Sequence, residues 1–299
     1  MRISCIAIIF LLLAGLIQGC GQPASSEKPQ ESAKNFEQFL SKPFLLGAHR
    51  GGGFVWPENT LAAFREAAKR YPGILLEADA RFTADGHVIL RHDDTVDRTT
   101  DGTGRPEEMT LAELKALDAG YSFSLDGGKT HPYRGKGLTI PTLEEALQAV
   151  PNERFQVEAK GGPELMEAII EIIRRNNAEH RVLLCSFFPE SMARLREIAP
   201  DLARTYDFET AEKLMRALRE GDWEAYRPSD HVLSMMQRHL REYSVTQDEI
   251  AAIREKGILF QIHTPNDETS LRKYLALGVD SILTDRPDLL ADILAEHKG

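Results

Sequence analysis

The chain has 299 residues, enough for one large domain or two ordinary ones, and its 42% apolar and 27% charged residues are typical of a globular protein. Its formal net charge of −10 argues against nucleic acid as the main partner. An anionic substrate would therefore need local cations or a metal ion to offset the negative field of the protein.

The first part of the chain, residues 1–19, is predicted to be a signal peptide that does not belong to the fold. Arg2 supplies a positive start, and the apolar stretch from Ile6 to Ile17 is too short to span a bilayer. Leu16 to Cys20 reads Leu-Ile-Gln-Gly-Cys and resembles the bacterial lipobox, which implies cleavage before Cys20 and lipid attachment to its thiol. We therefore expect a lipid-anchored protein of the bacterial cell envelope, on the periplasmic side of a membrane or at the cell surface. The alternative is an ordinary secretory signal with a chance cysteine.

Residues 20–43, rich in Ser, Gln, Glu, Lys and Pro, are predicted to be a tether between the lipid and a folded domain, 44–299. In that domain, apolar strand-like runs alternate with helical patterns. The predicted strands are Leu45–His49, Ile74–Asp79, Phe155–Lys160, Val182–Ser186, Leu202–Tyr206, His231–Met235, Leu259–His263 and Val279–Thr284. The predicted helices are 60–70, 142–149, 164–176, 190–198, 209–219, 247–255, 268–277 and 287–297. Eight strands, each followed by a helix, over roughly 255 residues predict a (β/α)8 barrel, the TIM-barrel architecture.

One further strand-like segment, His87–Leu90, does not fit this count. Only Thr83 to Gly86 separates it from the preceding extended run, whereas a parallel crossover needs about a dozen residues or more. Because Asp85-Gly86 is a hairpin turn signal, we expect a hairpin that extends past the second strand and brings His92 back to the barrel mouth. Residues 94–141, rich in glycine and with a helical pattern only at 111–117, are predicted to form a small insertion over the mouth.

Charged pairs stand at the ends of neighbouring predicted strands. Glu77 and Asp79 are two positions apart and therefore point the same way, and Glu158 and Lys160 share that spacing. The active sites of such barrels lie at the carboxyl ends of the strands. Three carboxylates brought together there would raise one another's pKa, and a divalent cation removes that conflict. Because an all-oxygen ligand set suits Ca²⁺ or Mg²⁺, we predict one such ion at Glu77, Asp79 and Glu158.

Cations and imidazoles accompany the carboxylates. Arg50 offers a fork suited to phosphate, and Lys160 offers a point charge. His49 and His92 titrate near neutral pH and suit proton transfer to and from oxygen. The combination predicts metal-assisted cleavage of a phosphoester with two histidines.

The motifs of the chain, taken in order, resemble those of the glycerophosphodiester phosphodiesterase family over about residues 45–287. They are His49-Arg50-Gly51, Pro57-Glu58-Asn59-Thr60, Glu77-x-Asp79, Thr83-x-Asp85-Gly86, His92-Asp93, Arg98-Thr99-Thr100, Glu158-x-Lys160, Ser186-Phe187 and Thr284-Asp285. The resemblance implies a variant TIM barrel and one Ca²⁺ or Mg²⁺ held by the three carboxylates. It also implies His49 and His92 as the acid–base pair, Phe187 among the substrate-binding residues, and the products glycerol 3-phosphate and an alcohol.

The chain departs from the family pattern after Phe260-Gln261-Ile262. Where the family usually shows Trp-Thr-Val-Asn, this chain has His263-Thr264-Pro265-Asn266. An imidazole therefore replaces the aromatic wall that typically faces the glycerol, and we expect His263 to contact the substrate. The alternative is a histidine at a barrel end without a ligand role.

Two expectations concern the remaining histidines and cysteines. A zinc site formed by histidines at strand ends is an alternative to the carboxylate site, but it is weakened because His231 opens its strand and so lies at the opposite face. The three cysteines, Cys5, Cys20 and Cys185, give no disulfide framework. Once the signal is removed and Cys20 is modified, Cys185 remains as an expected buried thiol.

These residues predict metal-dependent hydrolysis of small glycerophosphodiesters by a lipid-anchored enzyme. We expect His92, near the insertion and the leaving alcohol, to be the general acid and His49 to be the base. The nucleophile is either water or the glycerol 2-hydroxyl. One alternative is a lysophospholipase D-type activity on lipids with a bulky tail. Another is a non-catalytic lipoprotein that captures phosphodiesters, although capture alone does not need an acid–base pair.

Overall fold

The computed structural model describes residue 39 and residues 45–296 of the chain. The predicted signal peptide, the lipidation site at Cys20 and the predicted tether apart from Phe39 lie outside the described residues. Within the described part, none of the helices combines the length and the apolar character needed to cross a membrane.

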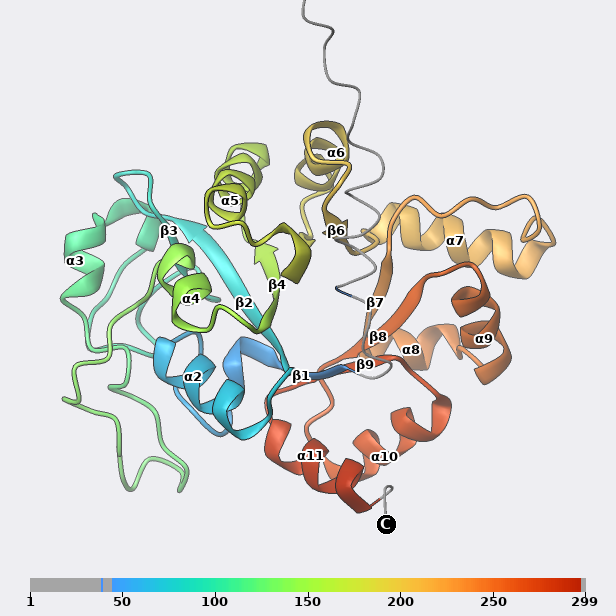
Figure 1. Ribbon diagram of the computed structural model, residues 1–299. Helices are drawn as coiled ribbons and strands as arrows, with labels where there is room; N and C mark the ends of the chain where they lie inside the picture. Colours follow the sequence, from blue (N-terminus) through green and yellow to red (C-terminus); the bar gives the residue numbers. More distant parts are fainter. Residues whose placement is uncertain (1–38, 40–44, 297–299) are drawn as a thin grey trace, which may run out of the picture.

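Parallel strands form the ring at the centre of the molecule, with helices around it (Figure 1). The parallel strands are β1 (Leu45–Ala48), β2 (Leu75–Phe82), β4 (Arg154–Ala159), β5 (Val182–Cys185), β6 (Ala203–Arg204), β7 (Val232–Met236), β8 (Leu259–His263) and β9 (Ser281–Thr284). Their spatial order is β6-β5-β4-β2-β1-β9-β8-β7. Thr205 and Val232 form a parallel bridge between the two outer strands, and the Tyr206 N–H donates to the Val232 carbonyl at 2.9 Å. The predicted TIM barrel is therefore confirmed.

The helices follow the strands in the predicted alternation. They are α2 (Leu61–Arg70), α4 (Leu143–Ala149), α5 (Pro163–Arg175), α6 (Pro189–Ile198), α7 (Phe208–Glu220), α8 (Gln237–Tyr243), α9 (Gln247–Glu255), α10 (Glu268–Leu277) and α11 (Pro287–Glu296), with a short 3-10 turn, η3, at Glu179–Arg181. Polar side chains cap the amino termini of several helices and so set where these helices begin. Thr60, for example, accepts a hydrogen bond from the Ala63 N–H at the first turn of α2. Helix α8, which lies between β7 and α9, is not among the helices predicted from the sequence.

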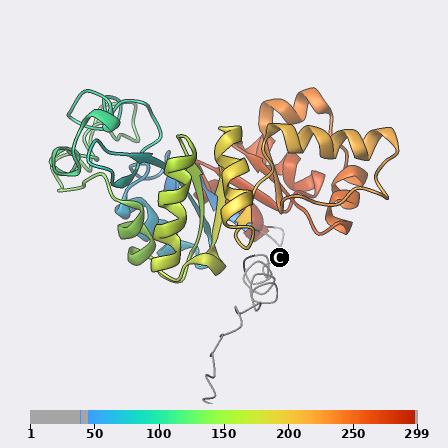
Figure 2. The ribbon, with the colours of Figure 1, turned by 90° about the horizontal axis from the view of Figure 1, so that it is seen from above.

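The predicted hairpin is present at the end of β2. Strand β3 (Val88–Leu90) runs antiparallel to β2, with Ala80 opposite Leu90 and Phe82 opposite Val88. The insertion that follows contains the 3-10 turn η2 (Pro106–Glu108) and the short helix α3 (Leu111–Lys115). It has a small apolar cluster of its own, built from Ile89, Val96, Leu114, Ala119 and Ile140. Figure 2 shows the insertion and α7 on opposite sides of the barrel.

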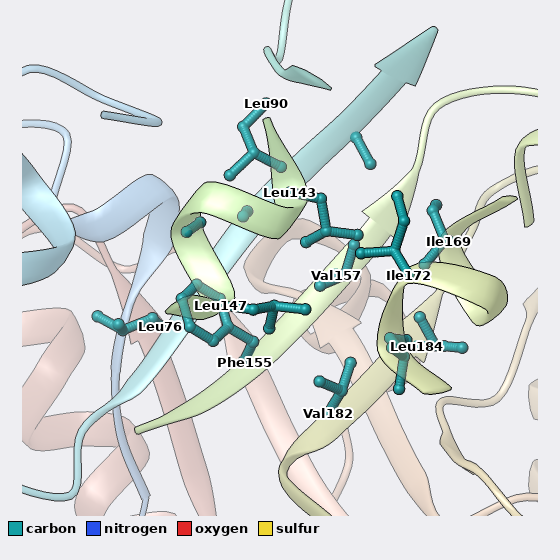
Figure 3. Close-up of a cluster of buried hydrophobic side chains, with 14 of the residues drawn as sticks. Leu76, Leu90, Leu143, Leu147, Phe155, Val157, Ile169, Ile172, Val182 and Leu184 are labelled. Atoms are coloured by element: carbon teal, nitrogen blue, oxygen red, sulfur yellow. The ribbon is translucent and has the colours of Figure 1, made fainter. Parts of the chain in front are cut away.

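Alternation along the strands separates two apolar layers. On the outer face of β2, β4 and β5, Leu76, Phe155 and Leu184 pack against α4 and α5 (Figure 3). The inner cluster consists of Phe39, Leu75, Leu183, Ala203, Val232 and Leu283. Phe39 is 1% exposed, and Arg154 donates a hydrogen bond to its carbonyl, so this residue of the predicted tether packs with the barrel.

The first strand and its turn bring the site together. Gly47 on β1 is required by close packing, because a Cβ there would lie 2.4 Å from Leu283 Cδ2 and 2.9 Å from the Ile282 carbonyl oxygen. The predicted first strand is one residue too long: His49 begins the 3-10 turn η1 (His49–Gly51). Arg50 adopts a φ of 54° in this turn, which aims its N–H at Glu77.

Candidate functional site

Three carboxylates from two adjacent strands converge at the barrel mouth. Ligand oxygens of Glu77, Asp79 and Glu158 all lie within 4.8 Å of one another. The cause is the register of β2 and β4, which pairs Asp79 with Glu158. Since Glu77 and Asp79 stand two positions apart, both face the barrel interior. Exposure of Glu77 is 3% and that of Asp79 is 0%, so neither charge is screened by water.

This burial sets the protonation of the cluster. Burial, followed by the adjacent Asp79, raises the pKa of Glu77 to about 8. Burial also raises the pKa of Glu158, although Lys160 acts against it. For Asp79 the effect of burial is outweighed by Lys160, His92 and Arg50, so its pKa is lowered. With a pKa of about 8, Glu77 is largely protonated at neutral pH when no metal ion is bound.

The carboxylates fit a divalent cation. Asp79 Oδ1 and Glu158 Oε1 are buried and have no hydrogen-bond partner of good geometry, although Lys160 Nζ lies 3.1 Å and 2.6 Å from them. Close, buried, under-satisfied carboxylate oxygens are the ligand set that Ca²⁺ and Mg²⁺ prefer. The acidic triad can therefore bind a metal ion.

Both predicted phosphate-binding cations lie beside the triad. Arg50 Nε is 3.6 Å from Asp79 Oδ2, and Arg50 Nη1 donates to Glu58 Oε1 at 3.4 Å. The buried Nε has no hydrogen-bond partner. Lys160 follows β4 directly and continues its ladder, because its N–H donates to the Ala80 carbonyl at 3.0 Å. The two cations thus flank Asp79.

His49 is oriented by a carboxylate from the last strand. Its Nδ1 lies 2.8 Å from Asp285 Oδ1, and its Nε2 lies 3.9 Å from Glu77 Oε2. Asn266 donates to Asp285 Oδ2 at 2.7 Å and accepts the Asp285 N–H at 2.9 Å. Burial lowers the pKa of His49, but Glu77 and Asp285 together outweigh it, so the pKa lies above the usual 6.5.

His92 is held in the same manner from the hairpin. Its Nδ1 lies 2.8 Å from Asp93 Oδ1. Arg81, on β2, donates to the His92 carbonyl at 3.0 Å and fixes the backbone there. Burial lowers the pKa of His92 below the usual 6.5, although Asp79 and Asp93 act in the opposite direction.

Two adjoining cavities open at this end of the barrel. The outer one, of about 490 Å³, is lined by both catalytic candidates together with Arg50, Glu158 and Lys160. The inner one, of about 380 Å³, runs along the side of β5 to β8. Phe187 and His263, predicted to contact substrate, line both cavities, and His263 Nδ1 lies 3.0 Å from Ser234 Oγ.

The residues predicted to bind metal, phosphate or substrate, or to act as acid and base, therefore all lie at the same end of the barrel. The zinc alternative finds no support in the described part of the chain. There, the potential metal ligands that lie close together in a group of three are the carboxylates of Glu77, Asp79 and Glu158, and no histidine belongs to that group. His231 precedes β7, at the other end of the strands, as expected. Cys185 is only half-buried and lines the inner cavity, because strand alternation turns it inward beside Gln156.

Several supporting residues were not predicted to take part in the site. Asn59 has a φ of 54° and brackets Asp79: it donates to Asp79 Oδ2 at 2.9 Å and accepts the Asp79 N–H at 3.2 Å. Arg98 donates to Glu58 at 2.6 Å and to Asp93 at 2.5 Å, which links the insertion to the carboxylate that faces His92. These residues stand inside the quoted motifs, but their partners are distant in sequence.

The fold and site together define a class of protein. A parallel α/β barrel that gathers carboxylates, imidazoles and phosphate-type cations at the carboxyl ends of its strands is a TIM-barrel enzyme with its site in the usual place. The buried acidic triad at this end of the barrel is a group of carboxylates that could hold a metal ion.

Comparison with known proteins identifies the family within that class. The pattern of the Glycerophosphoryl diester phosphodiesterase family matches residues 49–289. A glycerophosphodiester phosphodiesterase of Caldanaerobacter subterraneus subsp. tengcongensis is 32% identical over 259 residues, covering 84% of this chain and 97% of the relative. One from Bacillus subtilis is 28% identical, with 97% of each chain covered. The chain therefore belongs to the glycerophosphoryl diester phosphodiesterase family and is an enzyme of that family.

Solved structures agree with this assignment. A phosphodiesterase from Oleispira antarctica, determined in complex with its product sn-glycerol-3-phosphate, superposes with a TM-score of 0.68 at 26% identity, covering 86% of this chain and 99% of that one. A glycerophosphodiester phosphodiesterase from Agrobacterium tumefaciens gives a TM-score of 0.65 at 26% identity, covering 83% and 99%. The fold of this chain thus follows a known enzyme architecture.

Proposed function

We propose that this protein hydrolyses glycerophosphodiesters to glycerol 3-phosphate and an alcohol, with one Ca²⁺ or Mg²⁺ and two histidines. The observation that carries the proposal is the meeting of a buried carboxylate triad with two imidazoles whose Nδ1 atoms each face a carboxylate. Family membership supports the reaction class, and the product bound to the Oleispira antarctica enzyme supports the substrate class.

Glu77, Asp79 and Glu158 would hold the cation. When bound, it supplies a Lewis acid that polarises the phosphate and offsets the negative field of the site. Asn59 keeps Asp79 in its ligand orientation through the two hydrogen bonds described above. The three carboxylates then stay ionised at neutral pH, including Glu77, whose pKa is otherwise about 8.

Arg50 and Lys160 bind the phosphate oxygens in this scheme. Both side chains line the outer cavity, and both now rest against Asp79. Their charges stabilise the negative charge that the phosphate gains as the nucleophile adds. The unpartnered Nε of Arg50 supports this role, because a buried guanidinium N–H without a partner is costly unless a ligand accepts it.

The two histidines divide the proton transfers. His49, in the turn that follows β1 and beside Arg50, serves as the base that takes the nucleophile's proton. His92, on the hairpin next to the insertion, gives a proton to the leaving alkoxide. Asp285 and Asp93 each fix the neighbouring Nδ1, so that Nε2 of each ring is left for the reaction.

The test is incubation with glycerophosphocholine, with and without EDTA, scoring glycerol 3-phosphate. We expect release that EDTA abolishes and that Ca²⁺ or Mg²⁺ restores. A protein that only captures phosphodiesters would bind glycerophosphocholine and release nothing, and full activity after thorough chelation would exclude the metal.

We also propose that the enzyme is a lipid-anchored protein of the bacterial cell envelope, attached through Cys20. The proposal rests on the lipobox-like run Leu16 to Cys20 after an apolar stretch of signal-peptide length. The barrel would then work at a membrane surface, joined to it by the segment before Phe39.

A further inference from the structure

The insertion sends a charged side chain, Arg98, to the barrel mouth. Its guanidinium holds Glu58 with two N–H groups, since Nη1 lies 2.8 Å from Oε2 and Nη2 lies 2.6 Å from Oε1. Its Nε donates to Asp93 Oδ2 at 2.5 Å. A guanidinium is planar and carries its donors in a rigid fork. A side chain bound in this way therefore sets the relative positions of the two carboxylates that it contacts.

Each of these carboxylates contacts a residue that the proposed mechanism uses. Asp93 Oδ1 lies 2.8 Å from Nδ1 of His92, the proposed acid. Glu58 Oε1 accepts a hydrogen bond at 3.4 Å from Nη1 of Arg50, which is proposed to bind the phosphate. Arg98 itself is not among the described residues that line the outer or the inner cavity. It can therefore act on a bound substrate only through its two carboxylate partners.

Arg98 is the arginine that lies closest to Asp93. Arg91 also faces Asp93 Oδ2, but at 3.5 Å, and its Nε donates to the Thr95 carbonyl at 2.9 Å. Burial acts to raise the pKa of Asp93, but Arg98 and His92 outweigh burial and hold the pKa below its usual range. Asp93 therefore stays ionised at neutral pH and can accept the Nδ1–H of His92, which leaves Nε2 for the reaction.

The insertion fixes the backbone that carries Arg98. Ser122 Oγ donates to the Arg98 carbonyl at 2.6 Å. Two residues earlier, Val96 is fully buried in the apolar cluster of the insertion, and its carbonyl accepts the Thr100 N–H at 3.2 Å. The position of the guanidinium therefore depends on the packing of the insertion itself.

We propose that Arg98 is a positioning residue of the active site, which holds Glu58 and Asp93 in one fixed arrangement. Through these carboxylates it aligns His92 with Arg50, and therefore the proton donor with the phosphate. This inference rests on the proposed function and adds no chemical step to it. Without the guanidinium, Asp93 is free to turn away from the imidazole, which slows proton delivery. Glu58 then draws more strongly on Arg50, which weakens phosphate binding.

The kinetic test replaces Arg98 with alanine and measures kcat and KM separately on glycerophosphocholine. We expect kcat to fall by up to about 10²-fold, because a misplacement of about 1 Å can cause a loss of that size. KM should rise by a smaller factor through the effect on Arg50. Arg134→Ala is the matched control and should leave both constants as in the wild type. Arg134 is an exposed arginine of the same insertion and stacks on Tyr121, away from the site.

A double-variant comparison shows whether Arg98 acts through His92. In a His92→Ala background, Arg98→Ala should lower kcat no further, because the ring to be positioned is gone. A merely structural effect would lower kcat by the same factor in both backgrounds. That result would overturn the inference, and so would an unchanged kcat in the Arg98→Ala single variant.

Added guanidinium ion provides a measurement on the folded variant. Because an exposed ion pair contributes little to stability, Arg98→Ala should fold. Arg98 lines a separate cavity of about 250 Å³ together with Glu58, so a small ion has room to take the place of the side chain. Millimolar guanidinium chloride should restore several-fold of the lost kcat, whereas potassium chloride at the same ionic strength should not. Failure of guanidinium to restore any kcat would contradict the proposal.

An NMR measurement separates this inference from the proposed function, because it needs no turnover. The ring nitrogen shifts of His92, identified by their loss in His92→Ala, report which nitrogen carries the proton of the neutral ring. At pH 8.5 we expect the proton on Nδ1 in the wild type and in Arg134→Ala, and a mixture of both tautomers in Arg98→Ala. Unchanged shifts in Arg98→Ala refute the positioning role even if glycerophosphocholine is cleaved. If glycerophosphocholine is not cleaved while the shifts change, the proposed reaction fails and the positioning role stands.

Discussion

Rising pH should destabilise the metal-free protein, and a divalent cation should abolish that loss. Burial, together with Asp79, raises the pKa of Glu77 to about 8, whereas in the unfolded chain the pKa has its ordinary value near 4.5. A carboxyl group with a raised pKa in the folded state is protonated there and ionised in the unfolded state. Its contribution to stability is complete below pH 4.5 and is lost as the pH rises through 8.

The size of the effect follows from the same difference in pKa. At 1.36 kcal/mol for each pKa unit, the loss reaches up to about 5 kcal/mol above pH 8. For a domain of this size, a loss of 1 kcal/mol in stability lowers the melting temperature by about 2 °C. The ionisation of Glu77 should therefore lower the melting temperature of the metal-free protein by up to about 10 °C between pH 5 and pH 8.5. Burial of Glu158 acts in the same direction.

Thermal melts of the purified protein between pH 5 and pH 8.5, in EDTA and in saturating Ca²⁺ or Mg²⁺, measure this difference. Glu77→Gln should flatten the pH dependence in EDTA and should also lose most of the response to the cation. Glu171→Gln, an exposed carboxylate on α5, is the matched control and should behave as the wild type. A metal-free melting temperature that stays level from pH 5 to pH 8.5, or one that the cations leave unchanged in the wild type, would refute the reasoning.

Three other predictions address separate parts of the molecule. His92→Ala should lose roughly 10²–10⁴-fold in kcat/KM on glycerophosphocholine but far less on a p-nitrophenyl ester of glycerol phosphate, whose leaving group needs no proton, whereas His49→Ala should lose both alike. If His49→Ala is the variant rescued by the good leaving group, the two roles are reversed. Cys20→Ser should release the protein from the membrane fraction or block its processing, and unchanged mass and fractionation would show that Cys20 carries no lipid. Burial, with Arg204, lowers the pKa of His231 to about 4, so the free energy of unfolding should fall by up to about 3 kcal/mol as the pH drops from 6.5 towards 4. Denaturant unfolding at both pH values should show a smaller fall in the free energy of unfolding for His231→Gln than for the wild type. An equal fall in the two proteins would contradict this assignment.

The sequence by itself determined the barrel. Apolar runs of strand length alternate with capped helical patterns, and these are local signals that tertiary contacts did not override. The hairpin of β2 and β3 followed from chain geometry, because a turn as short as Thr83 to Gly86 cannot make a parallel crossover. The common direction of Glu77 and Asp79 likewise followed from their spacing, because side chains two positions apart on a strand point to the same face.

Only the tertiary structure decided what surrounds those residues. The pairs His49–Asp285 and Asn59–Asp79 join segments that are far apart in the chain, so no spacing rule reveals them. The burial of Phe39 under the barrel escaped prediction for the same reason, since the composition around it is that of a tether. The inner cavity is the clearest case: its volume depends on how helices α7 and α8 pack against β7, and packing between distant elements leaves no pattern in a single sequence.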